Sequence, residues 1–182
     1  MVLETDKYYH LYNRSNNEET IFKEEQNYIF FLERYRYYMD ESVSTLAYCL
    51  MPTHFHFVIK IITDDCVSLK KNIAALLGGY TKAINTTYER HGSLFQPRSK
   101  AKEIDDEEYL LTLMTYVHQN PVRAKLVGRM DDWKFSSYSD LTGTRNGTLP
   151  DRDFIRSYFS FSKDFQKYSE EIVPEIKKRY WV

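Results

Sequence analysis

The chain has 182 residues, of which 42% are hydrophobic and 28% charged, and these values are typical of one globular domain with a buried core. Its net charge of −1 argues against binding to nucleic acid through overall positive charge, so any such binding has to come from a local basic patch. Cys49 and Cys66 have neither the spacing of a metal-binding pair nor that of a disulfide framework. We therefore expect a reduced, cytoplasmic protein.

Neither a signal peptide nor a membrane span is expected. The N-terminal segment carries Glu4, Asp6 and Lys7 and has no apolar core. Residues 42–59 lack Lys, Arg, Asp and Glu, but Pro52 and several hydroxyl groups favour two strands and a turn over a membrane-spanning helix. We expect no membrane partner.

The first part of the chain predicts three strands and a helix. Residues 8–13 are short and aromatic, as in a strand. Apolar residues recur at intervals of three and four from Glu24 to about Met39, which predicts an amphipathic helix. Residues 43–50 and 54–62 read as two further strands, which the intervening Met-Pro-Thr turn joins into an antiparallel hairpin.

The middle of the chain predicts a long helix and an edge strand. The helix runs from Val67 to about Tyr88 and contains Gly78 and Gly79, each of which costs about 1 kcal/mol relative to Ala. We therefore expect either a bend there or the close approach of another backbone. Residues 93–102 are extended, and Pro97 favours a position at the edge of a sheet.

A third helix is expected from Tyr109 to about Asn120, where Pro121 should end it. Residues 133–138 are aromatic and should pack back on the core. Residues 142–150 are the best candidate for a linker, and the remainder has a helical composition. We therefore predict a domain at residues 1–142, followed by a linker and a helical C-terminal tail at residues 143–182.

The order strand, helix, strand, strand, helix, strand, helix predicts an α+β fold. In this fold an antiparallel sheet carries its helices on one side, in a ferredoxin-like arrangement. His54 and His56 lie two apart on the third strand, so both point to one face, with Cα atoms about 6.5 Å apart. Two imidazoles at this separation can reach one metal ion. The alternative is that both lie on the solvated face of an amphipathic strand.

Tyr116 and Asn120 lie four apart on the third helix and therefore share one face. By themselves they are compatible with an ordinary hydrogen-bonding pair. Together with the two histidines and several short motifs in the same order, they make the chain resemble the single-tyrosine HUH transposases, where HUH denotes His, a bulky hydrophobe and His. The motifs are Tyr9-His-Leu-Tyr-Asn-Arg14, Met51-Pro-Thr-His-Phe-His-Phe57, Gly92-Ser-Leu-Phe-Gln-Pro-Arg98, Tyr116-Val-His-Gln-Asn-Pro-Val-Arg-Ala124 and Trp133-x-Phe-Ser-Ser-Tyr138.

The resemblance covers about residues 8–142 and is strongest to the REP-associated tyrosine transposases. It implies the HUH endonuclease fold and a single-stranded DNA endonuclease and strand transferase that forms a 5′-phosphotyrosine at a hairpin-associated site. Tyr116 matches the nucleophile, and Asn120 matches a third metal ligand beside His54 and His56. The family uses Mg²⁺ or Mn²⁺, although imidazoles by themselves favour transition metals. Single-stranded or hairpin DNA is the expected partner, bound by a monomer or a homodimer.

Basic and polar side chains in these motifs are the expected DNA contacts; they are Asn13, Arg14, Arg98, Lys100 and Arg123. Tyr80 is the rival nucleophile, but no potential ligand accompanies it. His118 and Gln119 are rival ligands, although they lie on other faces of the helix than Tyr116. Two other functions stay open, namely a hairpin DNA-binding protein without cleavage activity and a ferredoxin-like RNA-binding module.

Overall fold

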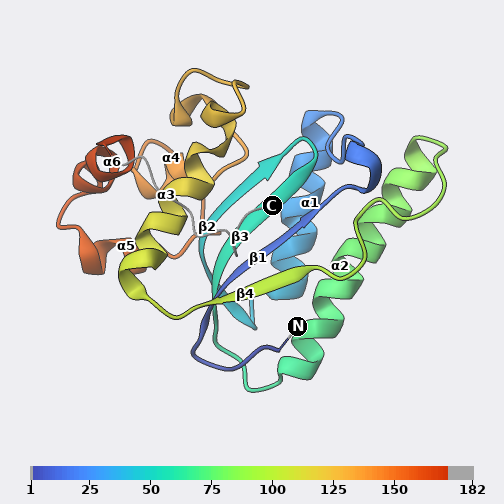
Figure 1. The fold of residues 1–182 in the computed structure, drawn as a ribbon, viewed down its shortest axis with the longest axis horizontal. Helices are drawn as coiled ribbons and strands as arrows, with labels where there is room; N and C mark the ends of the chain where they lie inside the picture. Colours follow the sequence, from blue (N-terminus) through green and yellow to red (C-terminus); the bar gives the residue numbers. More distant parts are fainter. Residues whose placement is uncertain (1, 172–182) are drawn as a thin grey trace.

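In the computed structural model, residues 2–171 are described, and four strands form one antiparallel sheet (Figure 1). The strands are β1 (Tyr8–Arg14), β2 (Val43–Met51), β3 (His54–Ile61) and β4 (Lys100–Ile104), in the spatial order β2-β3-β1-β4. This is the ferredoxin-like order, in which β3 lies between β1 and β2 and each neighbouring pair is antiparallel. The α+β fold and the β2–β3 hairpin are confirmed, and an edge strand is present, but β4 begins only after Pro97 and covers the end of the predicted segment 93–102.

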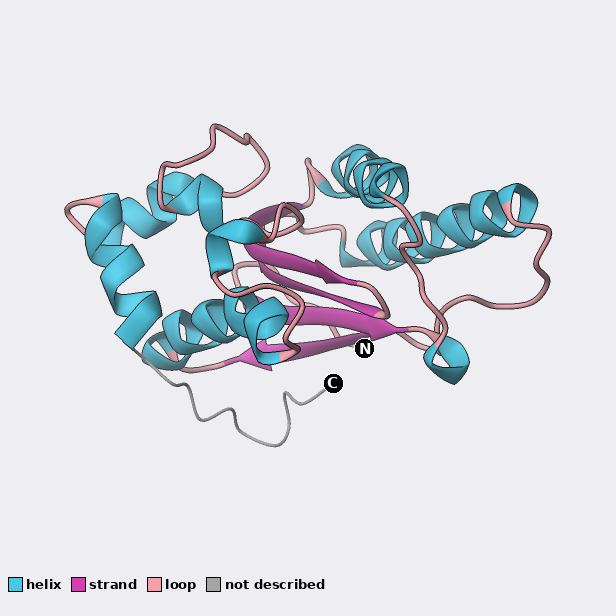
Figure 2. Ribbon diagram, turned by 90° about the horizontal axis from the view of Figure 1, so that it is seen from above, coloured by secondary structure: helices cyan, strands magenta, loops and turns pink. Residues whose placement is uncertain are grey.

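The prediction that the helices cover one side of the sheet is wrong. Helices α1 (Glu25–Met39) and α2 (Cys66–Thr87) lie together on one side, and α3 (Glu107–Arg123) lies on the other (Figure 2). Side chains alternate along a strand, so Phe57 joins the core under α1 and α2 while Val58 joins the core under α3. Helix α3 therefore covers the histidine face of β3, which argues against the alternative that this face is solvated.

Aromatic side chains fill the core between the sheet and α1 and α2. The rings of Tyr35 and Phe57 stack with centroids 3.9 Å apart, and Tyr80 packs edge-on against Phe31 at 5.0 Å. The Tyr35 hydroxyl lies 2.9 Å from the Thr45 hydroxyl, and the Tyr80 hydroxyl donates to the carbonyl of Ile21. Tyr35 and Tyr80 therefore serve packing, and both of their hydroxyl groups are satisfied inside the fold.

Of the two adjacent glycines in α2, only Gly79 has a close neighbour, which is a side chain. A Cβ atom at Gly79 would collide with the guanidinium group of Arg34 on α1, which also donates to the Tyr38 hydroxyl. A Cβ atom at Gly78 would meet open space. The expected close approach is therefore real at Gly79, but it involves the Arg34 side chain and not a backbone.

Pro121 does not end α3, which continues through it to Arg123. Proline lacks the N–H that would bond to the carbonyl of Val117. The side-chain amide of Asn120 takes over part of this role, because its Nδ2 lies 2.9 Å from the Tyr116 carbonyl and 3.4 Å from the Val117 carbonyl. The helix thus tolerates proline because the preceding residue supplies the missing donor.

The segment after α3 returns to the sheet, as predicted. The Trp133 indole donates to the carbonyl of Leu50, and the backbone N–H of Leu50 donates to the carbonyl of Phe135. Short helices follow: η2 (Met130–Asp132), α4 (Tyr138–Leu141), α5 (Arg152–Tyr158) and α6 (Ser162–Glu171), while η1 (Asn16–Glu18) follows β1. None of the helices within residues 2–171 is long and apolar enough to cross a bilayer.

The expected linker at residues 142–150 is tied to the rest of the fold. Arg145 reaches the buried carboxylate of Asp140 through Nε and Nη2, both at 2.7 Å, and the N–H of Gly147 donates to the same carboxylate at 2.8 Å. The N–H of Asp151 donates to the Thr45 carbonyl at the edge of the sheet. The division at residue 142 stays a prediction, and residues 172–182 of the expected tail lie outside the described residues.

Replacing Asp140 by alanine is expected to lower the free energy of unfolding by about 3 kcal/mol, because it removes the buried carboxylate that accepts from Nε of Arg145 and from the N–H of Gly147. Urea denaturation of both proteins measures the difference. Asp153→Ala is the control, since its pair with Arg156 is exposed and should contribute less than about 1 kcal/mol. Equal losses in the two variants would contradict the structural role of Asp140.

Candidate active site

The two histidines of β3 lie on the face of the sheet that α3 covers. In the strand register His56 lies opposite Cys49 of β2 and opposite Tyr12 of β1. His56 is fully buried and His54 is partly exposed, and their ring centroids are 5.0 Å apart. The pair therefore has one member in the core and one at the surface.

Helix α3 brings Tyr116 to this pair. The rings of Tyr116 and His56 meet edge to face with centroids 6.2 Å apart, and both Tyr116 and Asn120 are partly exposed. Asn120 follows one turn later on the same side of the helix, as the spacing predicted. Because its Nδ2 donates to helix carbonyls, its Oδ1 is the atom left for another partner.

The hydrogen bonds of the histidines leave one ring nitrogen of each for a ligand. Nδ1 of His56 lies 2.9 Å from Nε2 of His10, and Nδ1 of His54 lies 3.1 Å from the Thr53 hydroxyl. Nε2 of His56 is buried and has no hydrogen-bond partner in the described part of the chain. A buried nitrogen without a partner is costly unless something binds it.

These residues suit a divalent cation. Two imidazole nitrogens and an amide oxygen form a mixed N/O ligand set. Within residues 2–171, no group of three His, Cys, Asp or Glu side chains is arranged to hold a metal ion. The third ligand that the sequence comparison implied is of another kind, because Asn120 would offer its amide oxygen.

Burial keeps the histidines uncharged. Burial, and then the charge of Arg14, lowers the pKa of His54 to about 4. The pKa of His56 is also well below its ordinary value, through burial first and then through the neighbouring His10 and His54. Both rings are therefore neutral near pH 7 and carry the lone pair that a metal ion requires.

The phenol of Tyr116 is protonated near pH 7. Burial raises its pKa above the ordinary value of 10, and Arg123 opposes this effect, with its guanidinium carbon 5.4 Å from the ring centroid. A neutral phenol is a weak nucleophile. Chemistry at this hydroxyl therefore requires a nearby positive charge or a proton acceptor.

Basic side chains follow the same face of the sheet. Lys100 lies opposite Tyr12 in the register and Lys102 lies opposite His10, and their ammonium groups are 5.7 Å and 5.9 Å from the centroid of the Tyr12 ring. Arg14 lies opposite His54 at the end of β1 and is exposed. These residues form a local positive patch on a chain whose net charge is −1.

The predicted DNA-contact residues differ in exposure. Arg14, Arg98, Lys100 and Arg123 are exposed, whereas Asn13 is buried. The Asn13 amide donates to the carbonyl of Gln96 and to the hydroxyl of Ser99. Asn13 thus fixes the loop that carries Arg98. A cavity of about 220 Å³ lies between this loop and the end of β1.

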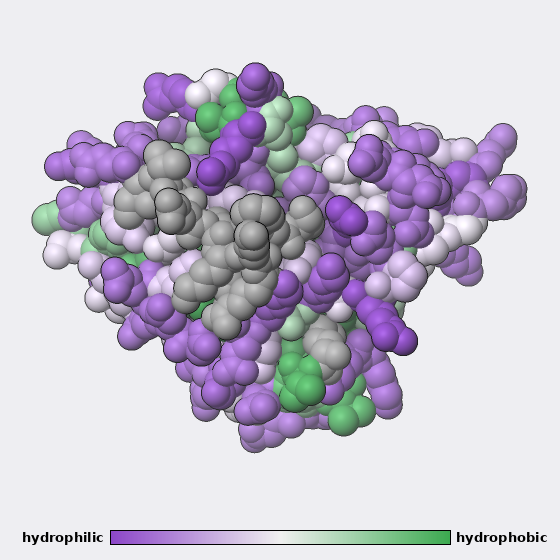
Figure 3. Space-filling model, in the orientation of Figure 1, coloured by the Kyte–Doolittle hydropathy of each residue, from purple (hydrophilic) through white to green (hydrophobic). Residues whose placement is uncertain are grey.

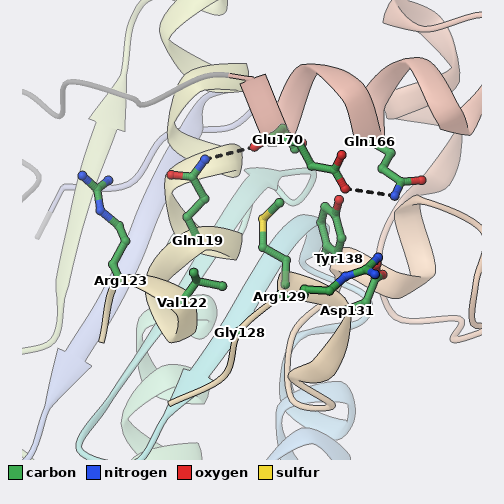
Figure 4. A pocket seen from close by; sticks show the side chains of 11 residues that line it. Gln119, Val122, Arg123, Gly128, Arg129, Asp131, Tyr138, Gln166 and Glu170 are labelled. Carbon is green, nitrogen blue, oxygen red and sulfur yellow. Dashed lines mark hydrogen bonds and ion pairs between the residues drawn. The ribbon is translucent and has the colours of Figure 1, made fainter. Parts of the chain in front are cut away.

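The rivals for the site lie elsewhere. The Tyr80 hydroxyl lies in the core on the opposite face of the sheet. Nε2 of His118 lies 2.8 Å from the Ser137 hydroxyl, and Gln119 donates to the carbonyl of Ser169 on α6. Gln119 lines a separate pocket of about 570 Å³ between α3, η2 and α6 (Figure 4).

Sequence reasoning did not assign a role to His10, Tyr12 or Lys102. All three lie on the histidine face, because His10 and Tyr12 are two apart on β1 and Lys102 pairs with His10 across β1 and β4. The alternation of His10 and Tyr12 was visible in the sequence. What the sequence lacked was the register that sets β1 beside β3.

Taken together, the sheet order, the His-x-His strand and the facing tyrosine define the class of α+β proteins with an HUH-type site. Residues 4–120 match the family of IS200-like transposases. This chain belongs to that family.

Two similar proteins carry more specific names. A Haemophilus influenzae protein named as a candidate REP-associated tyrosine transposase is 27% identical over 104 residues, which are 52% of this chain and 58% of that protein. The chain thus matches little more than half the length of that relative. A solved structure of a REP-associated tyrosine transposase bound to a REP hairpin shares the fold, with a TM-score of 0.63 and 18% identity over 83% of this chain and 91% of that one.

Proposed function

We propose that this protein is a metal-dependent endonuclease and strand transferase for single-stranded DNA, acting through Tyr116 at a site beside a DNA hairpin. The proposal is supported by the contact of Tyr116 with His56, whose unpaired Nε2 is the kind of atom that a metal ion needs. Family membership supports the same reaction class.

The reaction exchanges one phosphoester bond for another. The Tyr116 oxygen attacks the scissile phosphorus, the bond from phosphorus to the 3′ oxygen breaks, and the phenol proton is lost while the departing 3′ oxygen gains one. The products are a 5′-phosphotyrosine and a free 3′-hydroxyl. Because the bond energy is retained in the tyrosine ester, a 3′-hydroxyl of another strand can reverse the step without ATP.

His54, His56 and Asn120 would hold the divalent ion, for which Mg²⁺ or Mn²⁺ is the expected choice. When bound, the ion supplies positive charge that polarises the scissile phosphate. The chain itself orients the phenol, since the Tyr116 ring contacts both the His56 ring and the Arg123 guanidinium. This orientation is the contribution of α3 to catalysis.

The basic face of β1 and β4 would bind the DNA. Arg14 and Lys100 are exposed and close to the histidines in the register, and the exposed Arg98 lines a cavity with both of them, so all three can pair with phosphates along a strand that crosses Tyr116. Hydrophilic side chains dominate the surface that Figure 3 shows. Hairpin recognition is consistent with the similar solved protein, which is bound to a REP hairpin.

The decisive experiment looks for the covalent intermediate. Labelled single-stranded DNA that carries a hairpin is incubated with the protein and Mn²⁺, and SDS gels are searched for a labelled band at the mass of a protein–DNA adduct. Nuclease digestion and mass spectrometry should then assign the nucleotide phosphate to the peptide that contains Tyr116.

The rival functions predict other outcomes of the same experiment. Hairpin DNA binding without an adduct, for every hairpin from the source genome, would favour a binding protein that does not cleave. Preference for an RNA hairpin, again without an adduct, would favour the RNA-binding module. An adduct on a tyrosine other than Tyr116 would overturn the assignment of the nucleophile.

A further inference from the structure

The rings of His10 and His56 contact each other on the face of the sheet that α3 covers. Both side chains are fully buried, their ring planes are 12° from parallel, and Nε2 of His10 lies 2.9 Å from Nδ1 of His56. The pair joins neighbouring strands, because His10 lies opposite Val58 in the register and His56 is two residues from Val58. Diagonal neighbours of this kind are within reach of long side chains.

A hydrogen bond between two ring nitrogens holds one hydrogen and one lone pair. There are therefore two arrangements. In one, His56 carries its hydrogen on Nδ1 and donates to His10, which leaves a lone pair on Nε2 of His56. In the other, His10 donates, and a neutral His56 then carries its hydrogen on Nε2, where it has no acceptor within residues 2–171.

Hydrogen bonding alone does not choose between these arrangements, because the first places the other hydrogen on Nδ1 of His10, which is as buried as Nε2 of His56. The two arrangements differ at Nε2 of His56, where a lone pair can receive a cation and an N–H cannot. The first arrangement is therefore the one in which His56 can be a metal ligand, and the proposed chemistry requires it.

We propose that His10 is a positioning residue: its Nε2 accepts the hydrogen of His56 Nδ1 and so holds Nε2 of His56 as a ready lone pair. This inference rests on the proposed metal site for its purpose, but the hydrogen position is a property of the metal-free protein. The Thr53 hydroxyl is placed at His54 as His10 is at His56, because it lies 3.1 Å from Nδ1 of His54.

The first test reads the hydrogen positions directly. Two-bond ¹⁵N–¹H spectra of histidine-labelled, metal-free protein distinguish the two neutral tautomers, and single substitutions assign the five histidines. We expect the hydrogen of His56 on Nδ1. A hydrogen on Nε2 of His56 would overturn the inference, whatever the protein does to DNA.

The second test measures Mn²⁺ affinity by calorimetry without DNA. His10→Leu removes the acceptor and should weaken binding 10- to 100-fold, as is typical for loss of a partner behind a metal ligand. His10→Gln places an amide oxygen that can accept the same hydrogen, so its affinity should stay within a few-fold of wild type. If His10→Gln also loses affinity and its unfolding midpoint is unchanged, the positioning role is wrong.

His118→Leu is the matched control. His118 is equally buried and also forms one hydrogen bond, but its partner is Ser137 and not a candidate ligand. A purely structural role of His10 predicts equal Mn²⁺ affinity in His10→Leu and His118→Leu. If wild-type protein binds no Mn²⁺, the proposed metal site fails, while the tautomer spectrum still decides the inference about His10.

Discussion

Tyr116→Phe is expected to abolish the covalent protein–DNA adduct, with a loss of at least about 1,000-fold in the rate of its formation. The change removes only the hydroxyl oxygen that would attack phosphorus. Ring contacts with His56 and Arg123 do not need that oxygen, so the fold and hairpin binding should be unchanged. SDS gels measure the adduct, and fluorescence anisotropy with the same labelled hairpin measures binding.

Two other tyrosines provide sharp controls. Tyr12 lies as near to His56 as Tyr116 does, with ring centroids 6.4 Å apart, but it is only 2% exposed, so a phosphate should not reach it. Tyr80 lies in the core on the other face of the sheet. Tyr12→Phe and Tyr80→Phe should both keep the adduct. An adduct that persists in Tyr116→Phe and disappears in either control would move the nucleophile to that residue.

The second large effect concerns the histidines. His54→Ala is expected to abolish cleavage while hairpin affinity stays within a few-fold of wild type. Under the proposed function the affinity comes from phosphate and base contacts, whereas His54 would hold the ion that polarises the reacting phosphate. His54 is the better target for substitution because it is partly exposed, while truncation of His56 would open a cavity and disturb His10. Adduct formation and anisotropy, measured at one salt concentration, separate the two effects.

Substitution of an exposed arginine should have the opposite effect, namely weaker DNA binding with cleavage retained. Arg98→Ala should weaken hairpin binding and reduce the slope of log affinity against log salt by about one unit, while bound DNA is still cleaved. Loss of hairpin binding in His54→Ala to the same extent as in Arg98→Ala would contradict the separation of binding from chemistry. It would instead point to a structural role for His54.

Element order was accessible from the sequence because it depends on local patterns. An apolar, β-branched run after a Met-Pro break predicted the strand that carries His54, and apolar residues at intervals of three and four predicted α1 and α3. The spacing of Tyr116 and Asn120 predicted their common helix face. The two sides of the sheet were harder to assign. The strand that carries His54 and His56 looks half-polar, yet α3 covers that face, because His56 contacts His10 and Tyr116 and not water.

The remaining errors share one cause, which is that the deciding partner is distant in sequence or is a side chain. Pro121 predicts a helix end unless the amide of Asn120 supplies a donor. Gly79 indicates close approach, but only the packing of α1 identifies Arg34 as the neighbour. In the same way, the contact of His10 with His56 depends on the β1–β3 register, because the two residues are 46 apart in the sequence. Spacing along one element cannot reveal such contacts.

The amide of Asn120 links the shape of α3 to the candidate metal site. Its nitrogen is held by the carbonyls of Tyr116 and Val117, the second of which lost its usual donor to Pro121. Rotation of this side chain would break those bonds, so its oxygen keeps one orientation before any ligand arrives. The hydrogen bonds that compensate for Pro121 thus preorganise the oxygen of Asn120. Less side-chain conformational entropy of Asn120 is then lost when a cation binds this oxygen.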